Sequence, residues 1–252
     1  MAIKIEGTVA LVTGANRGIG RALTEALIAG GAKKVYAGSR DPKAVQDLAK
    51  QHGAKIVPLQ LDVTNAADVA NAVAKAADLQ LLINNAGVAT NFSAAFTDKS
   101  LIEAGRREIE VNVLGPFALT QGFAPILAKN GGGGIVNVLS VVSLVSFPVI
   151  ITYSASKAAA HSLTQATRSH LRAQGTYVGG AYPGPVDTDM AKDLAMDKAS
   201  PESVAKAILA GVEAGAEDIF PDPTSLEMGK AFFADPKAFE RQVGQPVEAA
   251  AA

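Results

Sequence analysis

Short apolar runs alternate along the chain with alanine-rich stretches that have helical spacing. The apolar runs are Thr8–Thr13, Lys34–Ser39, Lys55–Leu61, Leu79–Asn84, Gly134–Ser140, Thr176–Tyr182 and Glu217–Phe220. Each run is apolar almost throughout, which is typical of strands that are buried on both faces of a parallel sheet. The first five runs are followed by helix-like stretches, at 21–31, 42–53, 65–77, 100–127 and 152–173.

This alternation of strand and helix predicts an α/β fold. Right-handed crossovers turn repeated strand–helix units into a doubly wound, mostly parallel sheet with helices on both faces, here with seven strands in a Rossmann-like arrangement. No proline- or serine-rich linker interrupts the pattern, so we expect one domain over residues 1–252. The tail from about 221 to 252 is expected to be less regular, with a frayed end.

The composition excludes several classes of protein. The 252 residues include 23 basic and 24 acidic side chains, a net charge of −1, which argues against a nucleic-acid binder or a membrane-surface protein. The chain has no cysteine, so disulfides, thiolate metal sites and cysteine nucleophiles are excluded. His52, His161 and His170 are far apart in the sequence, and none has the spacing of a metal ligand, so no metal site is predicted.

Targeting and membrane signals are weak. The first residues lack the basic region, apolar run and cleavage site of a secretory signal. The apolar segment Ile135–Ile151 carries Asn137, three serines and Pro148, and it is shorter than the roughly 20 residues that a spanning helix needs. A buried strand followed by a loop explains this segment better, and we expect a soluble, cytoplasmic protein.

A glycine-rich loop follows the first strand directly. Its sequence, TGANRGIG, places glycines at Gly14, Gly18 and Gly20. Glycines let the backbone approach a pyrophosphate, and the next helix presents its N-terminal N–H groups to the anion. A plain strand-to-helix turn is the alternative, but the position on the first strand of a parallel sheet favours phosphate binding. The expected cofactor contacts are Gly14, Asn16, Arg17, Gly18, Ile19 and Gly20.

The end of the second strand indicates which dinucleotide binds. An acidic residue there holds the ribose hydroxyls of NAD, but this chain has Ser39 followed by Arg40. Arg17 in the glycine loop is a second cation, and two guanidiniums that converge suit a 2′-phosphate. Asp41 can pair with Arg40, hold the ribose, or cap a helix that begins near Pro42, and capping is favoured. We therefore favour NADP(H) over NAD(H).

The segment YSASK places Tyr153 and Lys157 four residues apart, on one face of a predicted helix. A nearby ammonium group favours the phenolate form of tyrosine, which makes the tyrosine a better proton donor and acceptor near neutral pH. A solvated surface pair has the same spacing, so the pair by itself is weak evidence for an active site.

The motifs together resemble the short-chain dehydrogenase/reductase family, over about residues 8–220. They are the glycine loop, LDV at Leu61–Val63, NNAG at Asn84–Gly87, VNV around Asn112, Ser140 thirteen residues before Tyr153, YSASK, and YPGPVDT at Tyr182–Thr188. The resemblance rests on all of them occurring in the order and spacing of the family.

The resemblance implies a role for each matching residue. Tyr153 is expected to donate a proton in reduction and accept one in oxidation, with its pKa lowered by Lys157, which also binds the nicotinamide ribose. Ser140 is expected to bond the substrate carbonyl, and Asn112 to hold a water in a proton relay. Further cofactor contacts are expected at Ser39, Arg40, Asp62, Val63, Asn85, Ala86, Gly87, Pro183, Gly184, Val186 and Thr188. Relatives commonly form homotetramers through the two long helices, so a homo-oligomer, with a tetramer favoured, is expected.

The segments around these motifs indicate the substrate. The expected pocket residues are Val142, Leu144, Val145, Phe147, Ile150, Met190 and Leu194, with Phe92 at the rim. They include no arginine or lysine to bind a carboxylate or phosphate, so an uncharged ketone or aldehyde, or its alcohol, is the expected substrate. Some of these residues can instead pack in the core or at an interface. Residues 189–200 are expected to form a mobile lid.

Four functions are compatible with the sequence, and an NADPH-dependent carbonyl reductase is favoured. Reduction of a 3-oxoacyl chain on an acyl carrier protein needs a basic docking surface, for which Lys129, Arg168 and Arg172 are candidates. An NAD-dependent alcohol or sugar dehydrogenase needs Asp41 on the ribose. A non-catalytic cofactor-binding protein is disfavoured, because such proteins usually lack the tyrosine or the lysine of the motif, and both are present here.

Overall fold

A computed structural model describes residues 2–90 and 96–244 of the chain, and it contains a seven-stranded sheet. The strands are β1 (Val9–Thr13), β2 (Lys34–Ser39), β3 (Ile56–Gln60), β4 (Leu81–Asn84), β5 (Gly134–Val138), β6 (Tyr177–Ala181) and β7 (Asp218–Ile219). Every pairing between neighbouring strands is parallel. The fold class and all seven predicted strands are confirmed.

The strand order is β3-β2-β1-β4-β5-β6-β7. After β3 the chain crosses from the outer edge to the far side of β1, so the order reverses between β1 and β4. At such a switch point the loops after the two strands leave in opposite directions and open a crevice at the carboxyl edge of the sheet. The glycine loop follows β1, and the NNAG segment begins with the last residue of β4.

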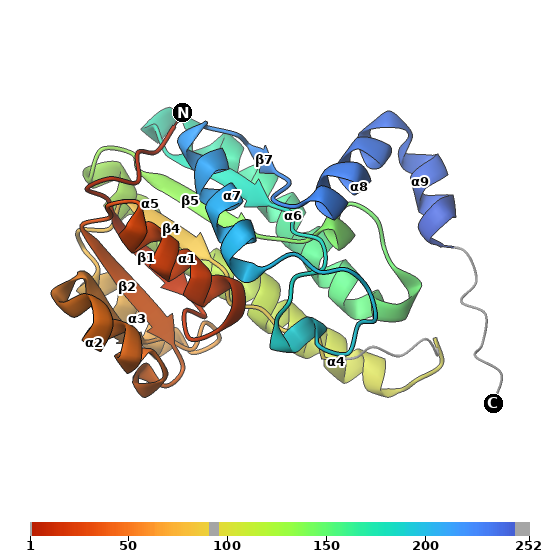
Figure 1. Ribbon diagram of the computed structural model, residues 1–252, viewed down its shortest axis with the longest axis horizontal. Helices are drawn as coiled ribbons and strands as arrows, with labels where there is room; N and C mark the ends of the chain where they lie inside the picture. The colour runs from red at the N-terminus through yellow and green to blue at the C-terminus, as the bar shows by residue number, and fades with distance from the viewer. Residues whose placement is uncertain (1, 91–95, 245–252) are drawn as a thin grey trace.

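Helices cover both faces of the sheet. The helices α1 (Gly18–Ala29) and α7 (Pro201–Glu213) pack against each other on one face, as Figure 1 shows. Residues of α2 (Gln46–His52) join the same apolar cluster. The other face is covered by α3 (Ala66–Lys75), α5 (Gly115–Lys129) and α6 (Ile151–Leu171).

The strands are buried on both sides, which explains their continuous apolar runs. In β1, Ala10 and Val12 belong to the cluster under α1 and α7, whereas Val9 and Leu11 belong to the cluster under α3 and α5. All four side chains are almost inaccessible to solvent. Successive strand residues point to opposite faces, so a strand covered on both faces needs an apolar residue at every position.

The long helical region predicted over 100–127 consists of three pieces. It begins as α4 (Ser100–Ile109), passes through one π-helical turn, η3 (Glu110–Leu114), and continues as α5. By length and composition alone, 100–129 is apolar enough to cross a membrane, but core helices pass the same test, and Leu119, Phe123 and Leu127 pack against the sheet.

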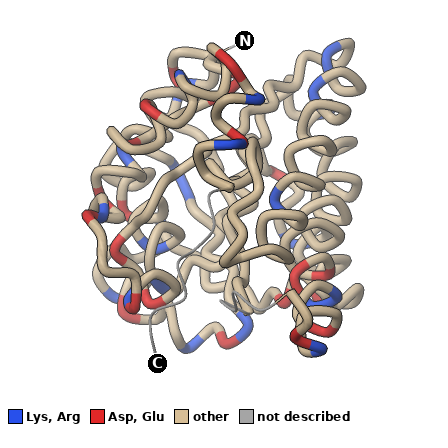
Figure 2. Tube along the Cα trace, turned by 90° about the vertical axis from the view of Figure 1, so that its right-hand side faces the viewer, with Lys and Arg blue, Asp and Glu red and all other residues tan. Residues whose placement is uncertain are grey.

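Basic and acidic residues are interspersed over the trace (Figure 2).

The prediction of an irregular tail from residue 221 is wrong for the part that the structure describes. Residues 223–234 form α8 and residues 236–243 form α9. Each helix starts with an aspartate N-cap followed by proline at the first helical position: Asp222 precedes Pro223, and Asp235 precedes Pro236. This pair is a strong helix-start signal that the sequence carries. The predicted frayed end lies outside the described residues.

Candidate active site at the carboxyl edge of the sheet

The glycine loop is packed so closely that Gly20 has no space for a side chain. A Cβ atom on Gly20 would lie 2.2 Å from Gly14 O and 2.4 Å from Asn85 Nδ2. Gly14 and Gly18 have φ angles of 66° and 52°, in the left-handed region that favours glycine. Gly18 is partly exposed and is the first residue of α1, and the N-terminus of a helix is a position that can bind an anion.

Hydrogen bonds join the glycine loop to the segment after β4. Thr13 Oγ1 accepts hydrogen bonds from the N–H groups of Asn85 and Ala86, both at 2.9 Å. The side-chain amide of Asn85 donates to Thr13 O at 2.9 Å. These bonds join the carboxyl ends of β1 and β4, so Asn85 and Ala86 lie beside the glycine loop.

The end of β2 carries one exposed basic side chain and two polar side chains that bond to nearby backbone groups. Ser39 is buried and donates to Asp41 O at 2.7 Å. The Asp41 carboxylate accepts from Lys43 N at 2.9 Å and caps a short helix, which confirms the favoured interpretation of this residue. Arg40 is exposed, and its charge reaches Asp62 at the end of β3. Arg40 is therefore available to an anion at the predicted position.

Asp62 carries its charge at this edge. Partial burial alone would raise the pKa of the carboxyl group. Hydrogen bonds from the N–H and hydroxyl of Thr64, at 2.9 and 2.7 Å, outweigh that effect and lower the pKa, with smaller help from Arg107 and Arg40. The carboxylate thus holds the turn after β3, and Val63 beside it is buried under α5.

Arg17 has a partner that the sequence did not predict. Its guanidinium bonds the Asp189 carboxylate at 2.8 Å, across a hollow of about 230 Å³ between α1 and residues 187–189. Both side chains are mostly exposed, so the pair contributes little to stability. The predicted convergence of Arg17 and Arg40 on one spot is not what these contacts show, because Arg17 is paired with Asp189.

Tyr153 and Lys157 lie one turn apart on α6, as predicted. Lys157 is buried, and its ammonium donates to Val138 O at 2.8 Å and lies 5.7 Å from the centroid of the Tyr153 ring. Burial lowers the pKa of Lys157 to about 8. Ser140, two residues after β5, lies near the Tyr153 hydroxyl and acts to lower the pKa of Tyr153.

The expected lowering of the Tyr153 pKa is wrong. Burial, followed by the charge of Glu108, raises the pKa of Tyr153 well above its usual value, and the opposing hydrogen bond from Ser140 is smaller. The prediction assumed that Lys157 directs its charge at the phenol, whereas the ammonium is bonded to the backbone of β5. A tyrosine in this environment holds its proton at neutral pH.

Asn112 lies in the π-helical turn and connects three segments. Its side-chain amide accepts from Val88 N and donates to Val88 O and Ser156 Oγ, each at 2.9 Å. A Cβ atom on Gly87 would lie 3.3 Å from Asn112 Oδ1 and 3.6 Å from Lys157 Nζ. Asn112 and Lys157 are therefore brought close together, as the predicted relay requires, whereas Gly87 lies beside them and not at the adenosine side where it was predicted. Ser156 was assigned no role, although it lies inside the YSASK segment.

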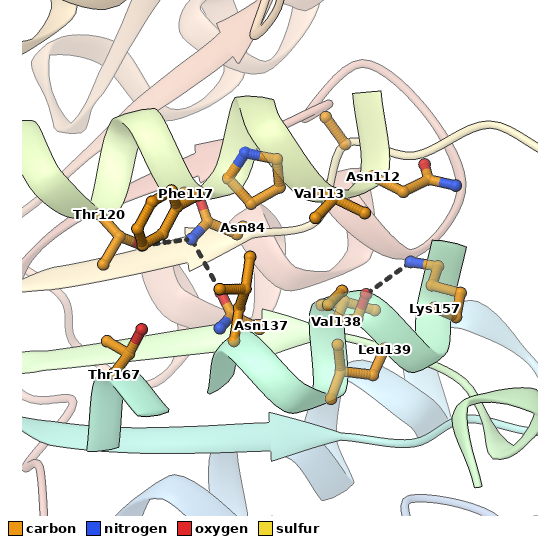
Figure 3. Close-up of a pocket in the computed structure, with 14 residues that line it drawn as sticks. Asn84, Asn112, Val113, Phe117, Thr120, Asn137, Val138, Leu139, Lys157 and Thr167 are labelled. Carbon is orange, nitrogen blue, oxygen red and sulfur yellow. Dashed lines mark hydrogen bonds between the residues drawn. The ribbon is translucent and has the colours of Figure 1, made fainter. Parts of the chain in front are cut away.

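A small polar cavity lies behind Lys157, between β4, β5 and the helices α5 and α6. Its volume is about 20 Å³, which holds one water molecule. Figure 3 shows Asn84 bonded to Asn137, at 2.8 Å, and to Thr120 on the wall opposite Lys157. Asn84 Oδ1 is buried and has no hydrogen-bond partner among the described residues. The cavity extends the polar surroundings of Lys157 away from Tyr153.

The loop after β6 is held by a residue that the sequence analysis missed. The N–H of Gly184 donates to the buried carboxylate of Asp222 at 2.9 Å, and Asp222 also caps α8. The same loop reaches the glycine loop, because a Cβ atom on Gly18 would lie 3.0 Å from Thr188 Cγ2. The carboxyl ends of β1, β4, β5 and β6 thus surround one crevice.

The sequence and the fold of this chain both match known proteins. The sequence profile described as short chain dehydrogenase matches residues 8–199. The chain belongs to the short-chain dehydrogenase/reductase family. This is an oxidoreductase family, and the resemblance carried by the motifs is confirmed.

Relatives of known sequence or structure agree with the assignment. A short chain dehydrogenase from Burkholderia cenocepacia, solved in complex with NADP, has a TM-score of 0.90 and 38% identity, covering 97% of this chain and 100% of that chain. An uncharacterized oxidoreductase of Staphylococcus saprophyticus is 32% identical over 82% of this chain and 92% of that protein. A 3-oxoacyl-(acyl-carrier-protein) reductase of Synechocystis is 31% identical over 74% of this chain and 77% of that protein.

The predicted substrate residues of this short-chain dehydrogenase/reductase differ in their exposure to solvent. Val142 and Val145 are buried, and Leu144 packs against a core cluster that contains Tyr182. Met190 and Leu194 are exposed, whereas Phe147 and Ile150 are partly buried near the start of α6. Leu144 is therefore better described as a packing residue. The predicted rim residue, Phe92, lies outside the described residues.

The structure also places two of the basic residues that were candidates for docking a carrier protein. Arg168, a candidate for docking a carrier protein, is bonded to Val178 O, Glu217 O and Asp218. Lys129 ends α5, just before β5 begins, so it lies near the amino edge of the sheet, away from the crevice. Within residues 2–90 and 96–244, no group of three acidic or histidine residues has the geometry of a metal site.

Proposed function

We propose that the protein is an NADP(H)-dependent oxidoreductase that reduces an uncharged ketone or aldehyde to an alcohol. The observation that carries the proposal is the grouping of Tyr153, Ser140 and Lys157 beside a glycine loop at the switch point of the sheet. The fit to a dinucleotide is supported by the loop itself, since Gly14 and Gly18, with positive φ angles, lead the chain from β1 into the start of α1 at the switch point.

Different residues of the crevice would hold different parts of NADP(H). Gly14, Gly18 and the first turn of α1 would meet the pyrophosphate, and Arg40 would meet the 2′-phosphate. Asp62 and Val63 would border the adenine, and Asn85 and Ala86 would line the adenosine side. Gly87 lies against Lys157 and would therefore be nearer the nicotinamide ribose. The loop after β6, with Pro183, Gly184, Val186 and Thr188, would seat the nicotinamide. When bound, the cofactor supplies the hydride.

Three side chains would handle the substrate oxygen. Ser140 donates a hydrogen bond to the carbonyl and stabilises the charge that develops on oxygen. Tyr153 gives its proton to that oxygen. Lys157 and Asn112 hold the proton path behind Tyr153, next to the small polar cavity. The predicted pocket residues that remain accessible, Phe147, Ile150, Met190 and Leu194, include no basic group for a carboxylate or phosphate, which supports a neutral substrate.

The decisive experiment measures carbonyl-dependent oxidation of NADPH with a panel of neutral ketones and aldehydes. We expect turnover in the wild type and a loss of at least about 100-fold in Tyr153→Phe, because general acid catalysis contributes roughly 10²–10⁴-fold. Cofactor binding by the variant, followed by fluorescence, is the control for folding. Turnover that survives Tyr153→Phe contradicts the assignment of the proton donor, and a wild type that binds NADPH but reduces nothing supports a non-catalytic cofactor-binding protein.

Cofactor choice is tested by dissociation constants for NADPH and NADH. We expect the wild type to prefer NADPH and Arg40→Ala to lose at least about tenfold of that preference, since charge-assisted bonds contribute roughly 1.5–3 kcal/mol. Arg17→Ala is the matched comparison, and a smaller change is expected because Arg17 is paired with Asp189. Equal or tighter binding of NADH, unchanged by Arg40→Ala, favours an NAD-dependent dehydrogenase.

The Synechocystis relative makes reduction of a 3-oxoacyl chain the second candidate. Two of its three candidate docking residues count against it, because Arg168 is occupied and Lys129 lies near the amino edge of the sheet. Activity with a short 3-oxoacyl thioester that exceeds activity with simple ketones would favour this candidate.

We also propose a cytoplasmic homo-oligomer, with a tetramer favoured.

A further inference from the structure

The peptide unit between Pro183 and Gly184, in the loop after β6, is bonded on both of its sides. Its carbonyl oxygen, Pro183 O, accepts from Val141 N at 3.1 Å and, in a longer contact, from Ser140 Oγ at 3.5 Å. Its N–H, on Gly184, donates to Asp222 Oδ2 at 2.9 Å. The carbonyl and the N–H of a trans peptide point in opposite directions, so this unit lies between the turn after Ser140 and the start of α8.

Asp222 makes this contact with one oxygen and caps α8 with the other. The residue is buried, and its Oδ1 accepts from Ser225 N at 2.8 Å. Ser225 is also buried, and its hydroxyl accepts from Asp222 N at 3.1 Å, which completes a capping box. Each carboxylate oxygen therefore has its own backbone donor, one within α8 and one in a loop 38 positions earlier in the chain.

The approach of α8 to the loop leaves little room for a side chain at Gly184. A Cβ atom there would lie 2.9 Å from Asp222 Oδ1 and 3.2 Å from the Cβ atom of Thr224, in the first turn of α8. The same helix packs against residues 141–143, the short turn that follows Ser140. Three segments therefore meet at one peptide: the loop after β6, the turn after β5 and the first turn of α8.

We propose that Asp222 is a positioning residue, which fixes the Pro183–Gly184 peptide so that the nicotinamide half of the cofactor is held against Ser140. This inference rests on the proposed function, in which the loop after β6 seats the nicotinamide and Ser140 bonds the substrate carbonyl. Reacting groups must be held close to their productive geometry, and a peptide that is bonded on both sides cannot rotate without breaking a hydrogen bond. The adenosine half meets the ends of β2 and β3 instead, so its binding should not depend on Asp222.

Two ligands separate the halves of the cofactor site. NADPH carries the nicotinamide, whereas 2′,5′-ADP has only the adenosine half with its 2′-phosphate, and calorimetry gives a dissociation constant for each. In Asp222→Ser, the serine still caps α8, but its single oxygen cannot also bond Gly184 N. We expect NADPH binding to weaken about tenfold, close to the contribution of one hydrogen bond, and 2′,5′-ADP binding to stay within about twofold.

The start of α9 offers a matched control. Asp235 also precedes a proline and caps its helix, but it is exposed, and its carboxylate accepts only from Lys237 N and Ala238 N in α9. Asp235→Ser should therefore change neither dissociation constant. Asp222→Asn, which keeps the size of the side chain but offers one acceptor oxygen, is the second variant if Asp222→Ser does not fold, and the same selective loss is expected.

The outcomes separate this proposal from the proposed function. In folded Asp222→Ser, a loss that falls equally on both ligands, or on neither, overturns the positioning role, because a purely structural defect would not select the nicotinamide half. A selective loss in a protein that reduces no carbonyl supports the role and contradicts the proposed function. A wild type that binds neither ligand contradicts both.

The link from Asp222 to Ser140 has a kinetic readout. With the enzyme saturated with NADPH, the single-turnover rate of ketone reduction should still fall about tenfold or more in Asp222→Ser, because the peptide no longer holds the turn after Ser140 and small misplacements are costly in rate. Asp235→Ser should keep the wild-type rate. A full wild-type rate in Asp222→Ser at saturating NADPH would overturn this link.

Discussion

At the scale of single residues, Lys157 is buried although burial destabilises its charged form. Its ammonium is almost excluded from solvent and has one backbone acceptor, Val138 O at 2.8 Å. A buried cation without a carboxylate beside it is costly, and the cost appears as a pKa lowered to about 8 by burial. Sites that perform proton transfer often retain such groups at the expense of stability.

The stability of the protein should therefore rise with pH in a defined window. The unfolded chain holds the Lys157 proton up to about 10.5, whereas the folded protein releases it near about 8. Between these values the unfolded state binds more protons, so the free energy of unfolding increases with pH, by on the order of 2–3 kcal/mol across the window. Denaturant unfolding of the wild type and Lys157→Met below and above pH 8 measures this, because the variant should lack that rise. A parallel pH dependence in both proteins would contradict the assignment.

At the scale of elements, the connection from β1 to α1 depends on close approach of backbone segments. The loop, the segment after β4 and the first turn of α1 meet where Gly20 has no room for a side chain. Sequence spacing predicted that this loop is a phosphate site. The contact of Gly20 with Asn85, which is 65 positions later in the chain, required the fold, because β1 and β4 become neighbours only through the crossover.

Gly20→Ala should break this junction. Its Cβ atom would overlap Gly14 O and Asn85 Nδ2, so the loop must move away from β4. We expect a destabilisation near the upper end of overpacking effects, about 3 kcal/mol, together with loss of cofactor affinity. Thermal unfolding and fluorescence titration with NADPH measure the two effects. Gly105→Ala on α4 is the matched control, since its Cβ atom would meet only a methyl group of Thr152, at 3.3 Å. Similar effects of both substitutions would show that the junction has no special role.

At the scale of the whole molecule, one outer surface is suited to assembly. The face of α6 away from the sheet exposes Ala155, Ala158 and Ser162, while Ala160 of the same helix is buried. Among the small residues of this helix, Ala158 is therefore available for close approach of another helix, whereas Ala160 packs inside. Small residues allow two helices to approach closely, in keeping with the proposed homotetramer.

Sedimentation analysis of the wild type and Ala158→Arg tests the assembly. We expect a tetramer that dissociates in the variant, because an arginine on this face separates the helices and places like charges together across a symmetric interface. Ala70→Arg, on the exposed side of α3, is the control and should keep the wild-type mass. A monomeric wild type would exclude the proposal, and equal masses for all three proteins would place the interface elsewhere.

The sequence by itself determined the fold class, the seven strands and the grouping of the main site residues. Strands covered on both faces must be apolar at every position, and turns against a phosphate need glycine, so these features are local and visible in the order of residues. Only the tertiary structure decided how the charges act. Three contacts join segments that are distant in sequence: Arg17 with Asp189, Lys157 with Val138 O, and Gly184 N with Asp222. Electrostatic effects depend on distance and solvent exposure, and both are set when the chain has folded.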